Sequence, residues 1–195
     1  MRTFLLETDN ESFKTLNLDT DTLVAQLMKQ PAASQRFDDA DDLTAYIVMA
    51  SVNNSSFFDI WGKVEASFDS PFEDVESLPD VSDWLMGYLL MNEKAYQALG
   101  RHIENEGELL PIWVGGNQMY LFNCLQFGLE DSSKCKKSDD YFYSEIGFDE
   151  NDIENKLLFK SALLSGSKLF TTDKFKRLYE QAQLTGLTFN TNLCD

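Results

Sequence analysis

Residues 107–125 read GELLPIWVGGNQMYLFNCL and contain the clearest structural pattern in the chain. Two apolar runs, at residues 110–114 and 118–127, flank the turn Gly115-Gly116-Asn117. Glycine and asparagine accept the left-handed backbone that tight hairpin turns require. The stretch therefore predicts a β-hairpin.

The segment before this hairpin has helical spacing. Asn92 can cap a helix in which Ala95, Leu99 and Ile103 follow at i, i+4 and i+8, and the helix is expected to end near Gly107. After the hairpin, YFYSEI (141–146) and LLFKS (157–161) are candidate strands. KLFTT (168–172) then leads into a helix capped by Thr172, and the last strand, LTFN (187–190), follows a glycine.

The first half has weaker patterns. RTFLLET (2–8) predicts a strand, and FKTLNL (13–18) is its candidate hairpin partner. A helix around Leu23 and Leu27 should end before Pro31, and residues 31–42 are expected to form a loop. Residues 43–52, LTAYIVMASV, fit a buried helix and a strand equally well. Residues 53–83 suggest short strands and ordered loops.

These elements define an expected fold class. Strands and helices intermix without a regular βαβ rhythm, which is typical of an α+β protein with mixed, mostly antiparallel strands and a few packed helices. The 195 residues contain no repeat and no Gly/Ser-rich or Pro-rich spacer. We therefore expect a single domain over residues 1–195, and a division into two lobes near residue 85 stays open.

The net charge of −17 restricts the partners of the protein. A field of this sign repels phosphate backbones, so direct nucleic-acid binding is not expected, although Lys134, Lys136 and Lys137 form one small basic group. The same field attracts a basic protein and accelerates its association. Solubility alone is the other explanation of the charge.

The cellular compartment is predicted from what the sequence lacks. Cys124, Cys135 and Cys194 show no metal-binding spacing, and such a sparse, odd set fits a reducing compartment. The N-terminus carries Glu7 and Asp9 where a secretory segment would be apolar, and no run approaches the ~20 apolar residues of a membrane span. We expect a cytoplasmic protein without membrane contact, metal or other cofactor.

No catalytic motif is present. Phosphate-binding glycine loops, zinc-protease helices and nucleophile elbows are all missing, and His102 is the single histidine. A surface or packing role fits this histidine, on the edge of a helical face, better than that of a catalytic base. An enzyme would have to use paired carboxylates, which should then converge on a cavity.

Candidate partner contacts are acidic clusters and two tryptophans. The acidic runs have two interpretations, as solvated loops or as electrostatic contacts for a basic partner. For Trp61 and Trp84 a core position is favoured, and an interface anchor is the alternative. The candidate set is Asp38, Asp39, Asp41, Asp42, Trp61, Trp84, Asp149, Glu150 and Asp152.

The order of segments in the second half resembles a bacterial family. LLMNEKAYQAL (89–99), then residues 107–125, and finally KLFTTDKFKRLYEQAQLTGLTF (168–189) follow one another as in small proteins first catalogued as a domain of unknown function. That family was later assigned to the immunity proteins of polymorphic toxin systems. Its motifs correspond to residues 92–95, 110–111, 120–123 and 184–187, whereas residues 30–58 depart from the pattern.

The resemblance implies an antitoxin-like function in bacterial competition. Such a protein binds a cognate toxin or effector domain, here one with a basic surface, and neutralises it by stoichiometric inhibition without catalytic residues. Two other hypotheses remain: a non-inhibitory adaptor or toxin-associated module, and a carboxylate-dependent enzyme. The toxin's activity and homo-oligomer formation stay open.

Overall fold

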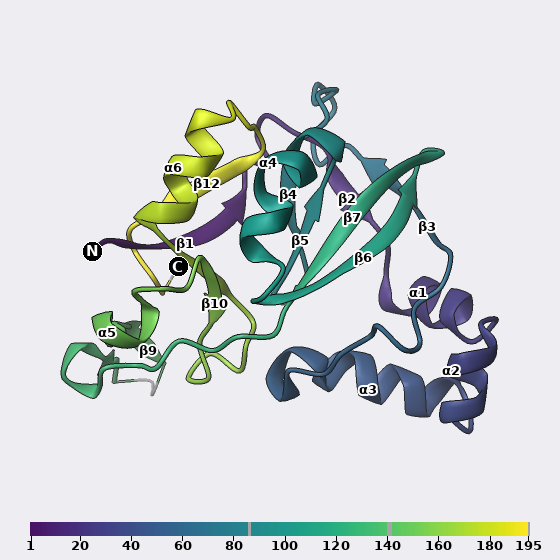
Figure 1. Ribbon diagram of the computed structural model, residues 1–195, viewed down its shortest axis with the longest axis horizontal. Coiled ribbons are helices and arrows are strands. Elements are labelled where there is room, and N and C mark those ends of the chain that lie inside the picture. The colour runs from purple at the N-terminus through teal and green to yellow at the C-terminus, as the bar shows by residue number, and fades with distance from the viewer. Residues whose placement is uncertain (86, 140–141, 195) are drawn as a thin grey trace.

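The fold is that of a mixed α+β protein, as the sequence predicts. The computed structural model describes residues 1–85, 87–139 and 142–194. These residues contain six α-helices and twelve strands. The strands form a six-stranded sheet, a four-stranded sheet and a two-stranded hairpin (Figure 1). Nearly all strand pairs are antiparallel.

The predicted hairpin lies in the middle of the six-stranded sheet. Its turn glycines, Gly115 and Gly116, have φ angles of 59° and 85°, the left-handed geometry that favours glycine. Strands β3 and β6 are parallel, and the other pairs are antiparallel. In spatial order the strands are β2 (Thr15–Asn17), β3 (Val64–Asp69), β6 (Gly107–Val114), β7 (Asn117–Cys124), β5 (Tyr88–Met91) and β4 (Val81–Trp84).

The four-stranded sheet joins the two ends of the chain. Strand β1, expected from RTFLLET, pairs with β11 and β12 on its two sides. The predicted hairpin between β1 and FKTLNL is wrong, because β2 pairs with β3 instead. In spatial order the strands are β10 (Leu158–Lys160), β11 (Leu169–Thr172), β1 (Thr3–Thr8) and β12 (Leu187–Asn190).

Three helices cover one face of the six-stranded sheet: α1 (Thr20–Leu27), α2 (Pro31–Arg36) and α3 (Ala40–Asn53) (Figure 1). Their apolar side chains pack against alternate residues of the sheet, such as Leu110, Ile112 and Leu121. The expected loop at 31–42 is wrong, because α2 begins at Pro31, where the missing N–H of proline is tolerated in the first helical turn. Residues 43–52, whose pattern fits both a helix and a strand, are helical.

The opposite face of the sheet packs against α4 (Glu93–Ile103) and α6 (Asp173–Gln181). The predicted cap of α4 is confirmed, since Asn92 Oδ1 accepts a hydrogen bond from Ala95 N at 2.9 Å. Thr172 occupies the N-cap position of α6 without capping it through its side chain. Its hydroxyl donates to the Lys156 carbonyl instead.

The rest of the second half forms a smaller unit beside β10. It contains the 3₁₀ turn η1 (Ser132–Lys134), the hairpin of β8 (Lys136–Lys137) and β9 (Tyr143–Glu145), and helix α5 (Glu150–Ile153). The strand predicted at 141–146 begins at Tyr141, which lies outside the described residues. Phe148, Phe159 and Phe170 form the small core of this unit.

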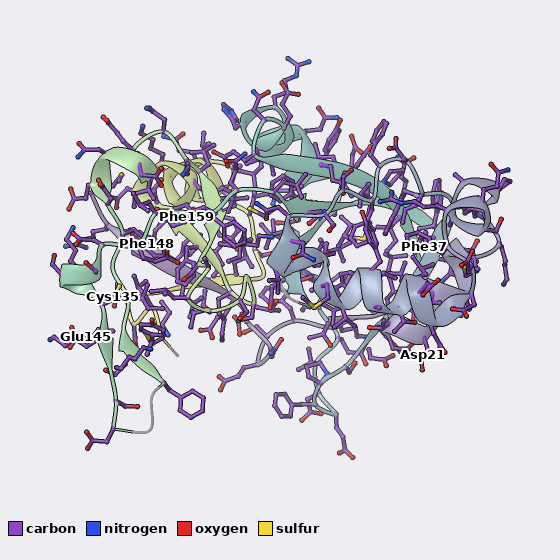
Figure 2. All side chains as sticks on the ribbon, turned by 90° about the horizontal axis from the view of Figure 1, so that it is seen from below. Asp21, Phe37, Cys135, Glu145, Phe148 and Phe159 are labelled. Carbon is purple, nitrogen blue, oxygen red and sulfur yellow. The ribbon has the colours of Figure 1, made fainter. Side chains whose placement is uncertain are left out.

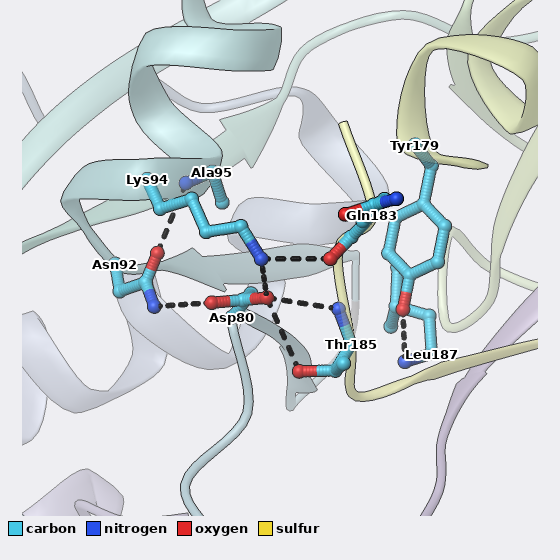
Figure 3. A network of polar contacts seen from close by, with 8 residues as sticks. All are labelled: Asp80, Asn92, Lys94, Ala95, Tyr179, Gln183, Thr185 and Leu187. Carbon is cyan, nitrogen blue, oxygen red and sulfur yellow. Dashed lines mark hydrogen bonds and ion pairs between the residues drawn. The ribbon is translucent and has the colours of Figure 1, made fainter. Parts of the chain in front are cut away.

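Asp80 joins segments far apart in the sequence (Figure 3). Its carboxylate accepts hydrogen bonds from Asn92 Nδ2 and Lys94 Nζ, both at 2.8 Å, and from Thr185 N at 3.0 Å. Lys94 also donates to the Gln183 carbonyl at 2.7 Å. The network therefore ties the start of α4 to the turn that follows α6.

No helix in the described part of the chain could cross a bilayer. The longest one, α3, has 14 residues, whereas a span needs about 20.

Candidate functional site

The acidic residues selected from the sequence form two separate clusters. One, Asp38, Asp39, Asp41 and Asp42, lies at the start of α3, and the other, Asp149, Glu150 and Asp152, lies at the start of α5. These helices are at opposite ends of the long axis of the molecule (Figure 1). Asp21 and Phe37 mark the α3 end in Figure 2, and Cys135 and Glu145 mark the α5 end.

The cluster at α5 is largely paired within the chain. Asp149 caps the helix by accepting from Asn151 N, and Asp152 accepts from Leu129 N and from Lys156 Nζ at 2.6 Å. Burial opposes the ionisation of Asp152, but these hydrogen bonds and the charge of Lys156 outweigh it and lower its pKa. Glu150 lies 3.7 Å from the N-terminal amine. This cluster already has structural functions.

The cluster at α3 leaves carboxylates accessible. Asp39 is the N-cap and accepts from Asp42 N at 3.0 Å. The Asp41 and Asp42 side chains are in the first turn, at the positive end of the helix dipole, and are exposed. Within the described residues Asp38, Asp41 and Asp42 form no ion pair. They are free to meet a cation of a partner.

The two candidate tryptophans are structural. Trp84 is 6% exposed, packs in the core and donates from its indole nitrogen to the Leu18 carbonyl at 3.0 Å. Trp84 therefore has the favoured core position and offers little surface to a partner. Trp61 is half-buried against the same core and donates to the Pro111 carbonyl at 2.8 Å. Both indoles already have the hydrogen-bond partner that a buried tryptophan requires.

An apolar surface on α3 was missed by the sequence reasoning. Val48, Met49 and Val52 are 47%, 45% and 38% exposed, whereas Leu43 and Ile47 on the opposite side of the helix are buried. The exposed residues follow Asp41 at helical spacing and share its face. The signal was present in the sequence, but it could be read only once residues 43–52 were known to be helical.

Leu85 lies beside this helix face. It lines the same cavity as Val48, is 48% exposed and has a φ angle of 45°, in the left-handed region that non-glycine residues rarely adopt. Strain of this kind often occurs at functional sites. We refer to the exposed surface formed by Asp41, Asp42, Val48, Met49, Val52 and Leu85 as the α3 patch.

The cavity next to the α3 patch has a volume of about 70 Å³. Apolar side chains from α1, α3, the following loop and the sheet line most of it. Tyr88 also lines it, and its hydroxyl is buried with no hydrogen-bond partner among the described residues. Burial raises the pKa of Tyr88 well above its usual value, so the phenol stays neutral. The full lining is Thr20, Leu23, Ile47, Val48, Ser51, Phe57, Trp61, Trp84, Leu85, Tyr88 and Leu121.

Glu108 fixes the loop that follows α3. Its carboxylate accepts hydrogen bonds from Phe57 N at 2.6 Å, Phe58 N at 3.2 Å and Ser56 Oγ at 2.6 Å. Asn123 Nδ2 donates to it as well, at 2.8 Å. The loop is therefore ordered although Phe58 is 73% exposed at its surface.

Lys160 fixes the C-terminal end of α3. Its ammonium donates to the Ser51 carbonyl at 2.6 Å, one of the last helical carbonyls, and the positive charge suits this end of the helix dipole. Burial lowers the pKa of Lys160 to about 8. The Ser51 hydroxyl donates to the Gly166 carbonyl. Helix α3 is thus bonded to β10 and to the loop before β11.

Two carboxylates share a separate polar cavity of about 310 Å³ between the sheets. Glu7 lies 3.9 Å from Lys168 Nζ, and Asp83 accepts hydrogen bonds from the backbone and hydroxyl of Thr8. Each carboxylate already has a partner within the chain. A third, Glu106, has its pKa raised by burial but accepts from Leu157 N and Leu158 N.

The remaining reactive side chains are dispersed. His102 is exposed on α4, and burial raises the pKa of the Cys124 thiol to about 12. Among the described residues, no group of three or more histidine, cysteine or acidic side chains is placed to hold a metal ion. The α3 patch, which combines exposed carboxylates with exposed apolar side chains, is the candidate site.

Comparison with known proteins leaves the family open. The chain matches no protein-family model, and no curated protein matches it.

Proposed function

We propose that this chain is a cytoplasmic immunity protein that binds a cognate bacterial toxin and neutralises it by stoichiometric inhibition, without enzymatic activity. The observation that carries the proposal is the α3 patch, in which free carboxylates adjoin exposed apolar side chains. Contiguous apolar surface on a protein commonly marks a binding site.

The charge of the patch indicates the kind of partner. Asp41 and Asp42 would suit a partner with a basic surface. Val48, Met49 and Val52 would suit apolar side chains of the partner beside it. The net charge of −17 would steer such a partner into contact. A nuclease toxin fits this description because it must itself bind phosphates.

The patch stands on a rigid support. Lys160 holds the end of α3, and Glu108 holds the loop that follows it. A surface that is already ordered loses little conformational entropy on binding, which favours tight association. Tight association is what a stoichiometric inhibitor needs.

The test is capture of the partner by tagged protein from its native cells, at several salt concentrations. We compare the wild type with Val48→Asp/Met49→Asp, which places charge in the patch. Phe72→Asp, an exposed apolar residue in the loop between β3 and β4, is the matched control. The captured partner is then assayed for toxicity with and without this protein.

We expect the wild type and Phe72→Asp to retain one toxic partner and silence it, and the double variant to lose it. Equal retention by the double variant would show that the patch is not the binding surface. Retention without silencing would indicate an adaptor instead of an inhibitor.

A further inference from the structure

We infer that the toxin inserts one branched aliphatic side chain, flanked by basic residues, into the cavity between α1, α3 and β4. This inference rests on the proposed function and specifies how the α3 patch recognises its partner. It concerns the cavity of about 70 Å³ whose exposed lining residues are Val48 and Leu85.

The size and walls of the cavity select its occupant. Leu23, Ile47 and Leu121 are buried apolar wall residues and none of the described lining residues is charged, so a charged group would lose its hydration there without compensation. A cavity of roughly 150 Å³ accommodates benzene in a protein interior. A cavity half that size is too small for an aromatic ring and fits the branched end of a valine, leucine or isoleucine.

The cavity differs from ordinary core packing in two ways. Leu85, one of its exposed lining residues, adopts a left-handed backbone, which is unfavourable for a non-glycine residue. Tyr88 in its wall is 5% exposed, and its hydroxyl has no partner among the described residues. Burying a hydroxyl without a hydrogen-bond partner is unfavourable. The strain at Leu85 is a cost to folding that a purely structural cavity would not require.

Charge determines which molecule carries the aliphatic residue. Thr20 lines the cavity, and its neighbours in the sequence, Asp19 and Asp21, are exposed at the start of α1. Asp41 lies on the same face of α3 as Val48. A second copy of this chain would bring the same carboxylates to the contact and be repelled. A basic toxin surface is attracted, and its apolar residue is placed over the exposed lining of the cavity.

The first experiment uses the free protein and xenon gas, which enters apolar cavities of this kind. We expect xenon to shift the methyl NMR signals of Leu23, Ile47 and Leu121. The methyls of Leu99, in the core on the opposite face of the sheet, serve as the internal control. In the complex with the captured toxin the xenon-induced shifts should disappear, because the cavity is occupied.

The second experiment fills the cavity by Ile47→Phe. This variant should bind the toxin at least tenfold more weakly than the wild type, whereas Ile47→Val, which leaves the space open, should bind within about threefold. Thermal unfolding verifies that each variant is folded. If Ile47→Phe does not fold, loss of the xenon shifts in the wild-type complex decides alone.

The outcomes separate this inference from the proposed function. A toxin that is bound and silenced while xenon still reaches the cavity in the complex would overturn the insertion and leave the immunity function standing. Failure of wild-type protein to retain any toxin would overturn both. Shifts at Leu99 in place of the cavity methyls would also contradict the insertion.

Discussion

Glu108 shows how one side chain can order a binding surface. Its carboxylate accepts three hydrogen bonds from the loop after α3 and a fourth from Asn123. We predict that Glu108→Gln lowers the free energy of unfolding by about 1–3 kcal/mol, because the new amide NH₂ faces donors. Urea denaturation measures this, with the exposed Glu104→Gln as the control. Equal midpoints for the two variants would contradict the role of Glu108.

Lys160 gives the folded protein a characteristic pH dependence. Its pKa is about 8 in the folded protein, and its ordinary value is 10.5. Between pH 7 and 9 the folded state releases this proton while the unfolded chain keeps it, so the Lys160 contribution to stability rises with pH. Below pH 7 both states are protonated and the contribution is constant.

Comparison with Lys160→Met isolates this effect. The stability of the wild type relative to the variant should increase by about 1 kcal/mol from pH 7 to pH 9, the order of magnitude of one pKa unit. Urea denaturation at the two pH values provides the measurement. A difference that does not change with pH would show that the ammonium titrates normally.

Residue-level predictions from the sequence succeeded where the interaction is local. Asn92 caps a helix that begins one residue later, so the cap could be identified from the sequence. Glu108 and Phe57 are 51 positions apart, and Lys160 and Ser51 are 109 apart. No local pattern encodes such pairs, and the support of the α3 patch therefore had to come from the structure.

At the level of elements, α3 carries the local charge that guides association. Asp41→Asn/Asp42→Asn should slow association with the toxin by roughly threefold or more at low salt, and the difference should shrink as salt screens the charges. Glu73→Gln/Asp74→Asn, in the exposed loop before β4, removes the same charge elsewhere. Stopped-flow measurements of both variants test the prediction. Equal slowing would show that only net charge matters.

The sequence predicted an element's pairing correctly where the paired residues lie close together in the chain. The β6–β7 hairpin was predicted correctly because its two strands adjoin one turn. The partners of β1, in contrast, lie near the other end of the chain, so the expected hairpin with residues 13–18 was wrong. The amphipathic face of α3 remained hidden because its apolar run also fits a strand.

At the scale of the whole molecule, Asp80 connects the start of α4 to the turn between α6 and β12. Burial opposes its ionisation, but hydrogen bonds from Lys94, Asn92 and Thr185 outweigh it, and its pKa lies below the ordinary value. The stability contributed by Asp80 is therefore present near neutral pH and is lost as pH falls through its folded pKa. Acid should weaken the connection.

We predict that Asp80→Asn lowers stability at pH 7 by about 1–3 kcal/mol and that the difference from the wild type shrinks on acidification. If residues 1–195 form one domain, tryptophan fluorescence and circular dichroism should report a single shared transition in both proteins. The tryptophans lie at positions 61, 84 and 113 and report on the six-stranded sheet. Two separated transitions would instead show two independently folding lobes.

The central claim is stoichiometric inhibition, and a titration tests it most directly. Increasing amounts of this protein are added to a fixed amount of the captured toxin, and the toxin's activity is measured at each ratio. The account predicts a linear decrease that reaches zero at one equivalent. Activity that persists at several equivalents, or that disappears far below one equivalent as an enzyme would cause, would contradict it.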